Sequence, residues 1–389
     1  MSDSGDGRRV LKTPAAWVGA PLALAVLLGL AAAIRILFND VTYFNPSDET
    51  VYLRYARTFA DTWAYSDVVR TFVEDPSLWI FPSPLRWSYI GTSALYCAGR
   101  GVCRYRTLAT LSTASGIVVV ALTYWLGVRL FERRTALVAT VLAATAPLQL
   151  ALGRRALADE FFCAVVLASV VAMLEWLRRP RPAWLIAWIV LTTLAFAAKE
   201  HFLFIYPVVL SVWWFRERRI RWIWVLPPLL FFAVFCALAG DVGSFFRIGR
   251  ALVSAMQAPY VVQFQSGPPQ RLLIDFLAIA PLVTIAFMAA ACHIHRGPNW
   301  SGQCCTLLLA AGILVVHSLV PSKNLRFVVT ADPFMRLLVA SWLPGTRSTA
   351  AALVGNAIVE MVLFYHIFIR YGVYDPVTSQ LMRALKMVP

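Results

Sequence analysis

The sequence predicts an all-α protein that crosses a membrane many times. Its 389 residues are 60% hydrophobic and only 14% charged, and the mean hydropathy of +0.69 is well above that of soluble domains. Long apolar runs recur along the chain, and short clusters of arginine and lysine separate them. This combination is typical of polytopic membrane proteins, in which apolar helices alternate with charged loops.

About eleven apolar segments are candidate transmembrane helices. A helix needs roughly 20 residues to cross the hydrocarbon core of a bilayer. Several of the segments are shorter, so we expect some of them to be tilted, broken or re-entrant. The segments are 16–37, 106–129, 135–152, 160–177, 183–198, 201–215, 221–239, 272–292, 303–320, 326–343 and 348–369.

The basic clusters predict how these helices are oriented. Lysine and arginine concentrate in cytoplasmic loops, and the net charge of +15 is spread over short inter-helix clusters, so it does not indicate a nucleic-acid partner. With the polar head (1–15) in the cytoplasm, the clusters at 129–134, 178–182 and 216–221 are cytoplasmic too. The first apolar run has no clear cleavage site and is expected to stay as a helix. The Ala- and Arg-rich composition favours a bacterial plasma membrane.

The longest outer segment, residues 38–105, is aromatic and amphipathic. Its first part repeats apolar residues every three or four positions, and Pro82 and Pro84 interrupt its second part. The pattern predicts helices that lie at the membrane surface, with Trp and Tyr at the depth of the headgroups. The same helices could also line a groove for a lipid tail. A second outer loop is expected at 240–271 and a short tail at 370–389.

Four outer connections carry ionisable groups beside the ends of apolar helices. They are "NPSDET" (45–50), "GRRALADEF" (153–161), "AAKEHF" (197–202) and "PSKNLRF" (321–327). Because unpaired charge beside a bilayer is costly, these groups are expected to contact one another or a charged ligand. One interpretation is a set of salt bridges that locks the helix ends. The other is a site where cations bind a lipid-linked phosphate and a carboxylate deprotonates an acceptor.

The order of these motifs resembles that of the GT-C glycosyltransferases, in particular the branch of the protein O-mannosyltransferases and the aminoarabinose transferases that modify lipid A. That branch carries an acidic pair in the first outer loop, an Arg…Ala-Asp motif, a Lys-Glu motif and a late Lys…Arg…Pro element. The matching residues here are Asp48-Glu49, Arg155 and Asp159, Lys199-Glu200, and Lys323, Arg326 and Pro333. The resemblance implies a GT-C-like transmembrane domain over residues 16–369.

The resemblance also implies an activity and a site. The enzyme would transfer a sugar, with inversion, from a polyprenyl-phosphate-linked donor to a lipid, glycan or protein acceptor at the outer face. The expected catalytic carboxylates are Asp48, Glu49 and Asp159. The resemblance favours Asp48 as the general base, although the sequence alone leaves the choice between Asp48 and Glu49 open. The donor phosphate is expected to contact Lys199, Lys323, Arg326 and Arg155. The substrate is expected to contact Glu160, Glu200, His201 and Tyr260.

Several alternatives stay open. No metal site is predicted. Glu49 and Asp159 could orient the acceptor, bind a divalent cation (Mg²⁺ or Mn²⁺) or pair with Arg155. Many relatives end in a soluble outer domain, and without one the acceptor is not identified. A transporter or lipid-linked sugar flippase, or a non-catalytic subunit of an envelope-glycan assembly complex, would also be polytopic. Transporters place their charges near the bilayer midplane, whereas here they gather at one face, which favours the enzyme.

Two further expectations concern side chains outside these motifs. Cys97 and Cys103 share the first outer loop and would form a disulfide in an oxidising compartment. Glu360 is a lone carboxylate within the last apolar segment. We expect it to pair with Asn356, with His366 or with an arginine of a neighbouring helix.

Overall fold

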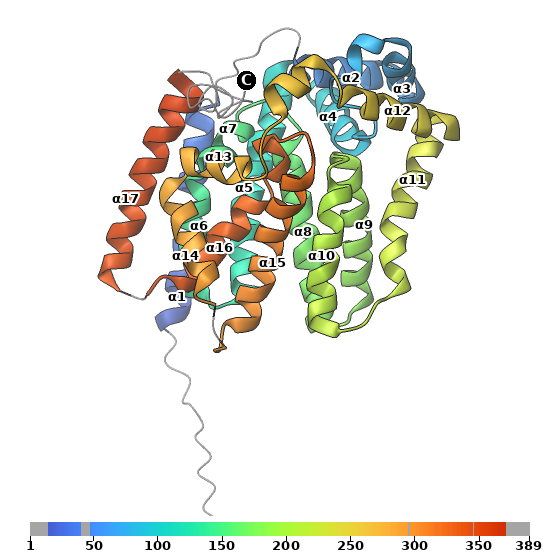
Figure 1. Cartoon of the computed structure of the whole chain (residues 1–389). Helices are drawn as coiled ribbons and strands as arrows, with labels where there is room; N and C mark the ends of the chain where they lie inside the picture. The colour runs from blue at the N-terminus through green and yellow to red at the C-terminus, as the bar shows by residue number, and fades with distance from the viewer. Residues whose placement is uncertain (1–14, 40–46, 295, 345, 371–389) are drawn as a thin grey trace, which may run out of the picture.

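The computed structural model describes residues 15–39, 47–294, 296–344 and 346–370, except for the side chains of 15–20, 264 and 347. Within these ranges every regular element is helical, as predicted. The helices form an upright bundle, and shorter helices lie across its upper end (Figure 1). The predicted head and tail fall almost entirely outside the described residues.

In the described ranges, seventeen α-helices and five short 3₁₀ or π turns follow one another along the chain. The α-helices are α1 (Ala15–Leu37), α2 (Asp48–Thr62), α3 (Tyr65–Glu74), α4 (Trp87–Arg100), α5 (Tyr105–Leu130), α6 (Arg133–Ala144), α7 (Pro147–Gly153), α8 (Asp159–Arg178), α9 (Pro182–Ala198), α10 (Phe202–Glu217), α11 (Leu226–Ala239), α12 (Val242–Ala255), α13 (Arg271–Ile279), α14 (Pro281–Cys292), α15 (Trp300–Leu319), α16 (Ala331–Trp342) and α17 (Arg347–Leu363). Short 3₁₀ and π turns are η1 (Pro76–Leu78), η2 (Trp222–Val225), η3 (Val261–Gln265), η4 (Leu325–Val328) and η5 (Phe364–Arg370).

The number of described helices that are long and apolar enough to cross a membrane is smaller than the predicted number of about eleven. Within the described ranges, five stretches are long and apolar enough: Tyr105–Leu130, Asp159–Arg178, Trp222–Ala239, Trp300–Leu319 and Ser348–Arg370. The pair α6 and α7, bent by 56°, would make a sixth. The helices Pro21–Leu37, Pro182–Ala198 and Pro281–Cys292 are apolar but shorter. The predicted number of about eleven spans is therefore not confirmed.

Proline explains two of the broken segments. Pro147 begins α7 just after α6 ends, and Pro281 begins α14 inside the predicted span 272–292, which is thereby divided between α13 and α14. Proline has no N–H to continue the helical ladder, so a carbonyl of the preceding turn is left without its usual partner. In a membrane such a carbonyl needs another donor.

Two buried arginines supply donors at the break between α6 and α7. Arg336 of α16 donates to the carbonyl of Leu142 at 2.6 Å. Arg35 of α1 donates to the carbonyl of Ala144, the last residue of α6, at 3.2 Å. Arg336 also pairs with Asp332 at 2.9 Å and with Glu360 at 2.8 Å. The partner of Glu360 is thus an arginine of a neighbouring helix, one of the predicted alternatives. This buried group joins α16 to α17.

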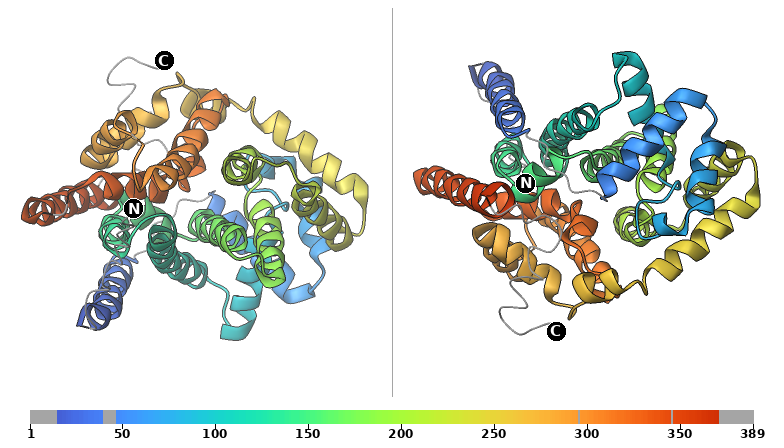
Figure 2. Two further views of the ribbon diagram at one scale, coloured as in Figure 1. Left: turned by 90° about the horizontal axis from the view of Figure 1, so that it is seen from below. Right: turned by 90° about the horizontal axis from the view of Figure 1, so that it is seen from above.

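The segment predicted as the first outer loop forms α2, α3 and α4, so the predicted helices and their interruption are present. α2 buries Tyr52 and Tyr55 and ends at Trp63, whose backbone is left-handed (φ 53°). Pro82 and Pro84 lie in the irregular stretch before α4. α2 packs against α4, and α3 packs against α11 and α12. Together these helices cover part of the upper end of the bundle (Figures 1 and 2).

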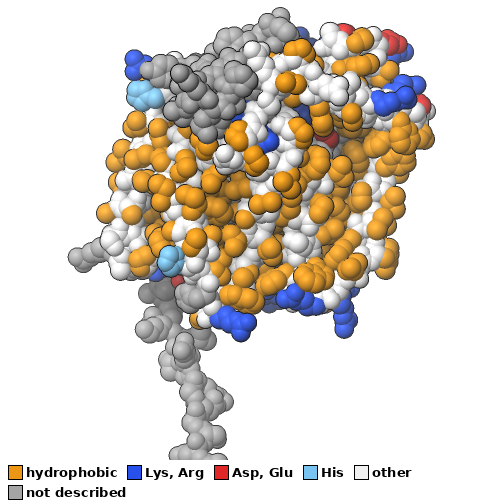
Figure 3. All heavy atoms as spheres, in the orientation of Figure 1, with side chains coloured by type: hydrophobic (Ala, Val, Ile, Leu, Met, Phe, Trp, Pro, Cys, Tyr) orange, Lys and Arg blue, Asp and Glu red, His pale blue; other side chains and the backbone are white. Residues whose placement is uncertain are grey.

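The molecular surface has the polarity of a membrane protein. A broad belt of hydrophobic side chains covers the flank of the bundle, lysine and arginine gather at its lower rim, and acidic and basic side chains lie near its upper edge (Figure 3). Such a belt matches the apolar interior of a bilayer. The chain is therefore an integral membrane protein.

Candidate active site

The four charged connections meet at one end of the bundle. Asp48 begins α2, Asp159 begins α8, Lys199 directly follows α9, and Arg326 lies in η4. Ion pairs join these four side chains, although they come from distant parts of the sequence. The expectation that the charged groups contact one another is confirmed.

Asp159 is the central residue of this group. Its Oδ1 accepts a hydrogen bond from Lys199 Nζ at 2.5 Å, and its Oδ2 accepts from Nε and Nη2 of Arg326 at 3.2 and 3.1 Å. The side chains of Asp159 and Lys199 are each only 1% exposed. A carboxylate in the first turn of a helix is also stabilised by the helix dipole. The partners of Asp159 are thus Lys199 and Arg326, not Arg155.

Asp48 is the carboxylate of this group that solvent reaches. Its Oδ2 lies 2.8 Å from Arg326 Nη1, and its side chain is 27% exposed, against 7% for Arg326. Ser47 caps α2 by accepting a hydrogen bond from the backbone N–H of Thr50, which fixes Asp48 in the first helical turn. Arg326 therefore bridges an accessible carboxylate and a buried one.

Glu49, the neighbour of Asp48, has a different environment. Its side chain is 1% exposed, and Arg155 donates to both carboxylate oxygens, from Nε at 3.0 Å and from Nη2 at 2.6 Å. The backbone N–H of Ala156 adds a third hydrogen bond at 3.2 Å. Glu49 thus ties α2 to the connection before α8, and the two adjacent acids differ in their access to solvent.

Lys199 has no free approach to solvent either. Besides its bond to Asp159, its Nζ donates to the backbone carbonyl of Arg326 at 3.0 Å. Burial lowers the pKa of Lys199 to about 8, against the opposing effect of the Asp159 charge. The Lys199 side chain holds both Asp159 and the segment that carries Arg326.

The loop after α12 rests on the same segment. The carbonyl of Gln265 accepts from the backbone N–H of Lys323 at 2.5 Å, and the Gln265 side chain accepts from Ser322 Oγ at 2.9 Å. Tyr260 of this loop is 44% exposed. Lys323 directs its Nζ to the carbonyl of Val320 at 3.0 Å. These two contacts between the loop and the segment 322–323 are thus made by Gln265, and Tyr260 was the residue predicted to contact the substrate.

His201 packs beside the ion pairs but does not join them. Its ring stacks on that of Phe327 with 3.8 Å between centroids, and Lys199 Nζ lies 5.1 Å from the centre of the same phenyl ring. Burial, and next the charge of Lys199, lower the pKa of His201 well below its usual range, so the imidazole is neutral near pH 7. Among the residues described, no three His, Cys, Asp or Glu side chains are placed to hold a metal ion.

Glu160 lies deeper than the other predicted contacts. Its side chain is fully buried directly after Asp159, and within the described chain neither carboxylate oxygen has a hydrogen-bond partner. A Cβ on Gly116 would come within 3.4 Å of Glu160 Oε2 and 3.0 Å of Arg35 Nε. The absence of a side chain at Gly116 thus leaves room for this acid and for Arg35.

The sequence interpretation missed Arg86, at the start of α4. Arg86 binds both carboxylate oxygens of Glu200, from Nε at 2.7 Å and from Nη2 at 2.8 Å, and donates to Tyr52 Oη at 2.5 Å. Burial alone would raise the pKa of Glu200, but Arg86 lowers it to about 2, so Glu200 stays ionised. An arginine inside the apolar stretch "FPSPLRWSYIG" was the available signal, since such a charge needs a partner.

Replacing Arg86 with Lys is expected to destabilise the protein while keeping the charge. An ammonium group lacks the planar fork of guanidinium, so Glu200 or Tyr52 would lose its donor, at a cost of about 1–3 kcal/mol in the free energy of unfolding. Chemical denaturation of the purified variant in detergent measures the loss. Arg54→Lys is the matched control, because Arg54 is an exposed arginine paired with Asp75, and its stability should hardly change. Equal losses in both variants would contradict the assigned contacts.

Part of the sequence matches a known protein family. Residues 103–240 match the family described as dolichyl-phosphate-mannose-protein mannosyltransferase. This segment contains Arg155, Asp159 and Lys199 but neither Asp48 nor Arg326. No curated protein matches the chain.

Solved structures of two membrane proteins share the fold. ArnT from Cupriavidus metallidurans, bound to undecaprenyl phosphate, is 19% identical with a TM-score of 0.58, over 89% of this chain and 64% of that chain. Its apo state gives 18% identity and the same TM-score, over 89% and 63%. The oligosaccharyltransferase AglB from Archaeoglobus fulgidus, in complex with an inhibitory peptide and a dolichol-phosphate, is 11% identical with a TM-score of 0.62, over 93% and 57%. The chain thus spans less than two thirds of the length of these proteins.

The likeness concerns the arrangement of helices, since sequence identity is below 20% in every case. It nevertheless extends over about nine tenths of the chain. The family match and the structural likeness point to the same group of proteins. The chain therefore has the fold of the GT-C membrane glycosyltransferases and, as its motifs predict, resembles their protein mannosyltransferase and ArnT branch.

Proposed function

We propose that this protein is a glycosyltransferase that moves a sugar from a polyprenyl-phosphate-linked donor to an acceptor at the extracytoplasmic face of the membrane, with inversion at the anomeric carbon. The contact of Arg326 with both Asp48 and Asp159 carries the proposal, because it places a cation beside an accessible carboxylate at a helix end. The structures of ArnT with undecaprenyl phosphate and of AglB with a dolichol-phosphate support the class of the lipid carrier.

Asp48 is our choice for the general base. A base has to come within hydrogen-bond reach of the proton that it removes. The Asp48 side chain is 27% exposed and contacts one cation, whereas Glu49 is 1% exposed and accepts three hydrogen bonds. We assign Glu49, with Arg155, to anchoring α2.

In the proposed step a sugar moves from the polyprenyl phosphate to the acceptor. The acceptor hydroxyl or amide gives its proton to Asp48 as its oxygen or nitrogen bonds to the anomeric carbon. On the opposite side the bond from that carbon to the phosphate oxygen breaks, and the electron pair stays with the polyprenyl phosphate. Arg326 stabilises the negative charge that develops on this leaving group. Configuration at the anomeric carbon inverts because attack and departure take place on opposite sides.

Donor binding would also change the state of the base. Arg326 now contacts Asp48 through Nη1 and Asp159 through Nε and Nη2. A donor phosphate that takes the place of Asp48 on Nη1 would release this carboxylate for the acceptor. We assign Lys199 to positioning, because its 1% exposed side chain holds Asp159 and the Arg326 carbonyl. Lys323 is still predicted to contact the donor phosphate. Contacts with the substrate are still predicted for Glu160, Glu200, His201 and Tyr260.

Transfer of radiolabelled sugar from a panel of polyprenyl-phosphate sugars tests the proposal. Membranes that contain the wild-type protein should pass label to an acceptor, membranes that lack it should not, and the active donor identifies the sugar. The anomeric configuration of the product tests inversion. If no donor supports transfer although the purified protein is folded, the proposal fails. Movement of an intact labelled donor across the membrane would then favour a flippase or transporter. If the labelled donor does not move either, a non-catalytic subunit would be favoured.

Arg326→Gln is expected to impair use of the donor more than use of the acceptor. Removing a hydrogen-bond donor that stabilises charge in the transition state lowers the rate about 10²–10³-fold. The loss of phosphate binding should also raise the KM for the sugar donor. Initial rates with donor and acceptor varied separately measure both effects. Arg221→Gln is the control, since Arg221 pairs with Glu217 after α10, away from this site. Equal effects on donor and acceptor would count against phosphate binding by Arg326.

A further inference from the structure

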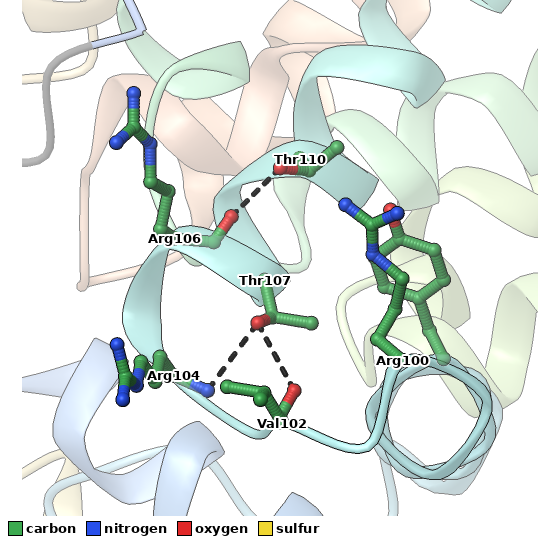
Figure 4. A pocket seen from close by; sticks show the side chains of 7 residues that line it. Arg100, Val102, Arg104, Arg106, Thr107 and Thr110 are labelled. Atoms are coloured by element: carbon green, nitrogen blue, oxygen red, sulfur yellow. Dashed lines mark hydrogen bonds between the residues drawn. The ribbon is translucent and has the colours of Figure 1, made fainter.

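A pocket of about 380 Å³ lies between the end of α4 and the start of α5. Arg100 flanks it on the α4 side, and Arg104 and Arg106 flank it from the start of α5 (Figure 4). None of these residues belongs to the group around Asp159. The volume falls at the lower end of the range of small-molecule sites, about 300–1,000 Å³, so the pocket has room for a small polar group.

The three arginines have no acidic counterpart nearby in the sequence. There is no Asp or Glu between Asp75 and Glu132, and the ion pairs of the described residues in this region involve other arginines, Arg54, Arg70 and Arg86. The pocket lies at the end of the bundle that bears Asp48, the side predicted to face out. Arginine is normally scarce there, because lysine and arginine concentrate in cytoplasmic loops. An excess of positive charge in this place favours an anionic ligand.

The connection that carries the pocket is held in place by several contacts. A disulfide joins Cys97 to Cys103, as expected for an oxidising compartment. Arg57 of α2 donates to the carbonyl of Cys103 from Nε at 3.1 Å and from Nη2 at 2.8 Å. Tyr105 Oη donates to Thr50 Oγ1 of α2 at 3.2 Å. The backbone around the arginines is thereby fixed to the helix that begins with Asp48.

The chemistry of the lining favours a phosphate group. Guanidinium binds phosphate through two parallel hydrogen bonds, and the pocket includes the first turn of α5, where the helix dipole favours an anion. Apolar and aromatic side chains share the lining with the charged ones: Tyr96 lines the pocket, and so does Val102, which is 43% exposed. Arginines next to exposed apolar groups at a membrane surface match a lipid headgroup above its tails.

We propose that this pocket binds a phosphate-bearing group, either the headgroup of an anionic lipid or free phosphate, at a site separate from that of Asp48 and Arg326. The ligand would lie beside α2 and bridge the end of α4 and the start of α5. The site does not depend on the proposed glycosyltransferase activity, since its residues take no part in the sugar-transfer step.

Protection of the three arginines from chemical modification tests the site. The full-length protein in a neutral detergent is treated with phenylglyoxal, which modifies accessible guanidinium groups, and modification of each arginine is followed by peptide mass spectrometry. The probes are inorganic phosphate, short-chain phosphatidylglycerol and, as a zwitterionic control, short-chain phosphatidylcholine. We expect phosphatidylglycerol to slow modification of Arg100, Arg104 and Arg106 several-fold, and to leave Arg54 and Arg247, exposed arginines paired with aspartates, unaffected.

The outcomes separate the two sources of the phosphate. Protection by phosphatidylglycerol alone identifies a lipid headgroup, and equal protection by inorganic phosphate identifies a free-phosphate site. No protection by either probe, or the same protection at Arg54 and Arg247, would overturn the proposal. A second measurement compares binding of radiolabelled phosphatidylglycerol to wild type, to the Arg100→Gln/Arg106→Gln variant and to Arg54→Gln. The double variant should bind about 10-fold or more weakly, because charge-assisted hydrogen bonds are lost, and unchanged binding would also overturn the proposal.

Discussion

Asp48→Asn is expected to lower the rate of sugar transfer by about 10²–10⁴-fold, the range that a general base contributes. The amide keeps the size of the side chain but cannot take the proton of the acceptor. Because the side chain is 27% exposed and sits at the N-terminus of α2, folding should be little affected. The rate constant at saturating donor and acceptor in proteoliposomes, together with the thermal midpoint, separates the two effects.

Two other carboxamide variants serve as comparisons. Glu217→Gln changes a carboxylate paired with Arg221 at the end of α10 and should leave the transfer rate unchanged. Glu49→Gln removes charge from a buried pair with Arg155, so its main effect should be lower thermal stability. Near-normal transfer by Asp48→Asn would reject Asp48 as the base. A loss of rate in Glu49→Gln without any loss of stability would move that role to Glu49.

The meeting of the four charged motifs was predictable from the sequence. Each motif lies at the end of an apolar helix, and the alternation of basic clusters assigns all four ends to one side of the membrane. Charges at neighbouring helix ends are then expected to pair, because an unpaired charge beside a membrane is costly. The identity of the pairs was not predictable. Whether Arg155 contacts Glu49 or Asp159 depends on how α2 and α8 are rotated against each other, and no local sequence pattern encodes that rotation.

The predicted number of membrane spans is not confirmed, for a related reason. A hydropathy window sees the apolar run 272–292 as one span, but Pro281 divides it into α13 and α14. The run 135–152 likewise becomes α6 and α7. At this break Arg35 and Arg336, which come from distant helices, donate hydrogen bonds to backbone carbonyls at the end of α6. A proline indicates where a helix breaks, but only the packed structure shows which side chain completes the hydrogen bonds.

Asp159→Asn is expected to cause the largest loss of stability, about 3–5 kcal/mol in the free energy of unfolding. Asp159 is the shared partner of Lys199 and Arg326, and all three side chains are at most 7% exposed. Removing the carboxylate leaves the buried Lys199 without its carboxylate partner and leaves Arg326 paired with Asp48, which is the costly way to break a buried ion pair. Chemical denaturation in detergent measures the loss. Asp241→Asn, in an exposed pair with Arg247, is the control and should change little.

A second substitution distinguishes loss of charge balance from loss of packing. In Asp159→Asn/Lys199→Gln the charge of Lys199 is removed as well, so the double variant should be more stable than the sum of the two single losses predicts. Residues in direct contact typically show such coupling, about 0.5–3 kcal/mol. Strict additivity would mean that the 2.5 Å contact between Lys199 and Asp159 does not stabilise the fold. Transfer should stay impaired in the double variant even where stability returns, because Arg326 has lost the carboxylate that holds its Nε and Nη2 in place.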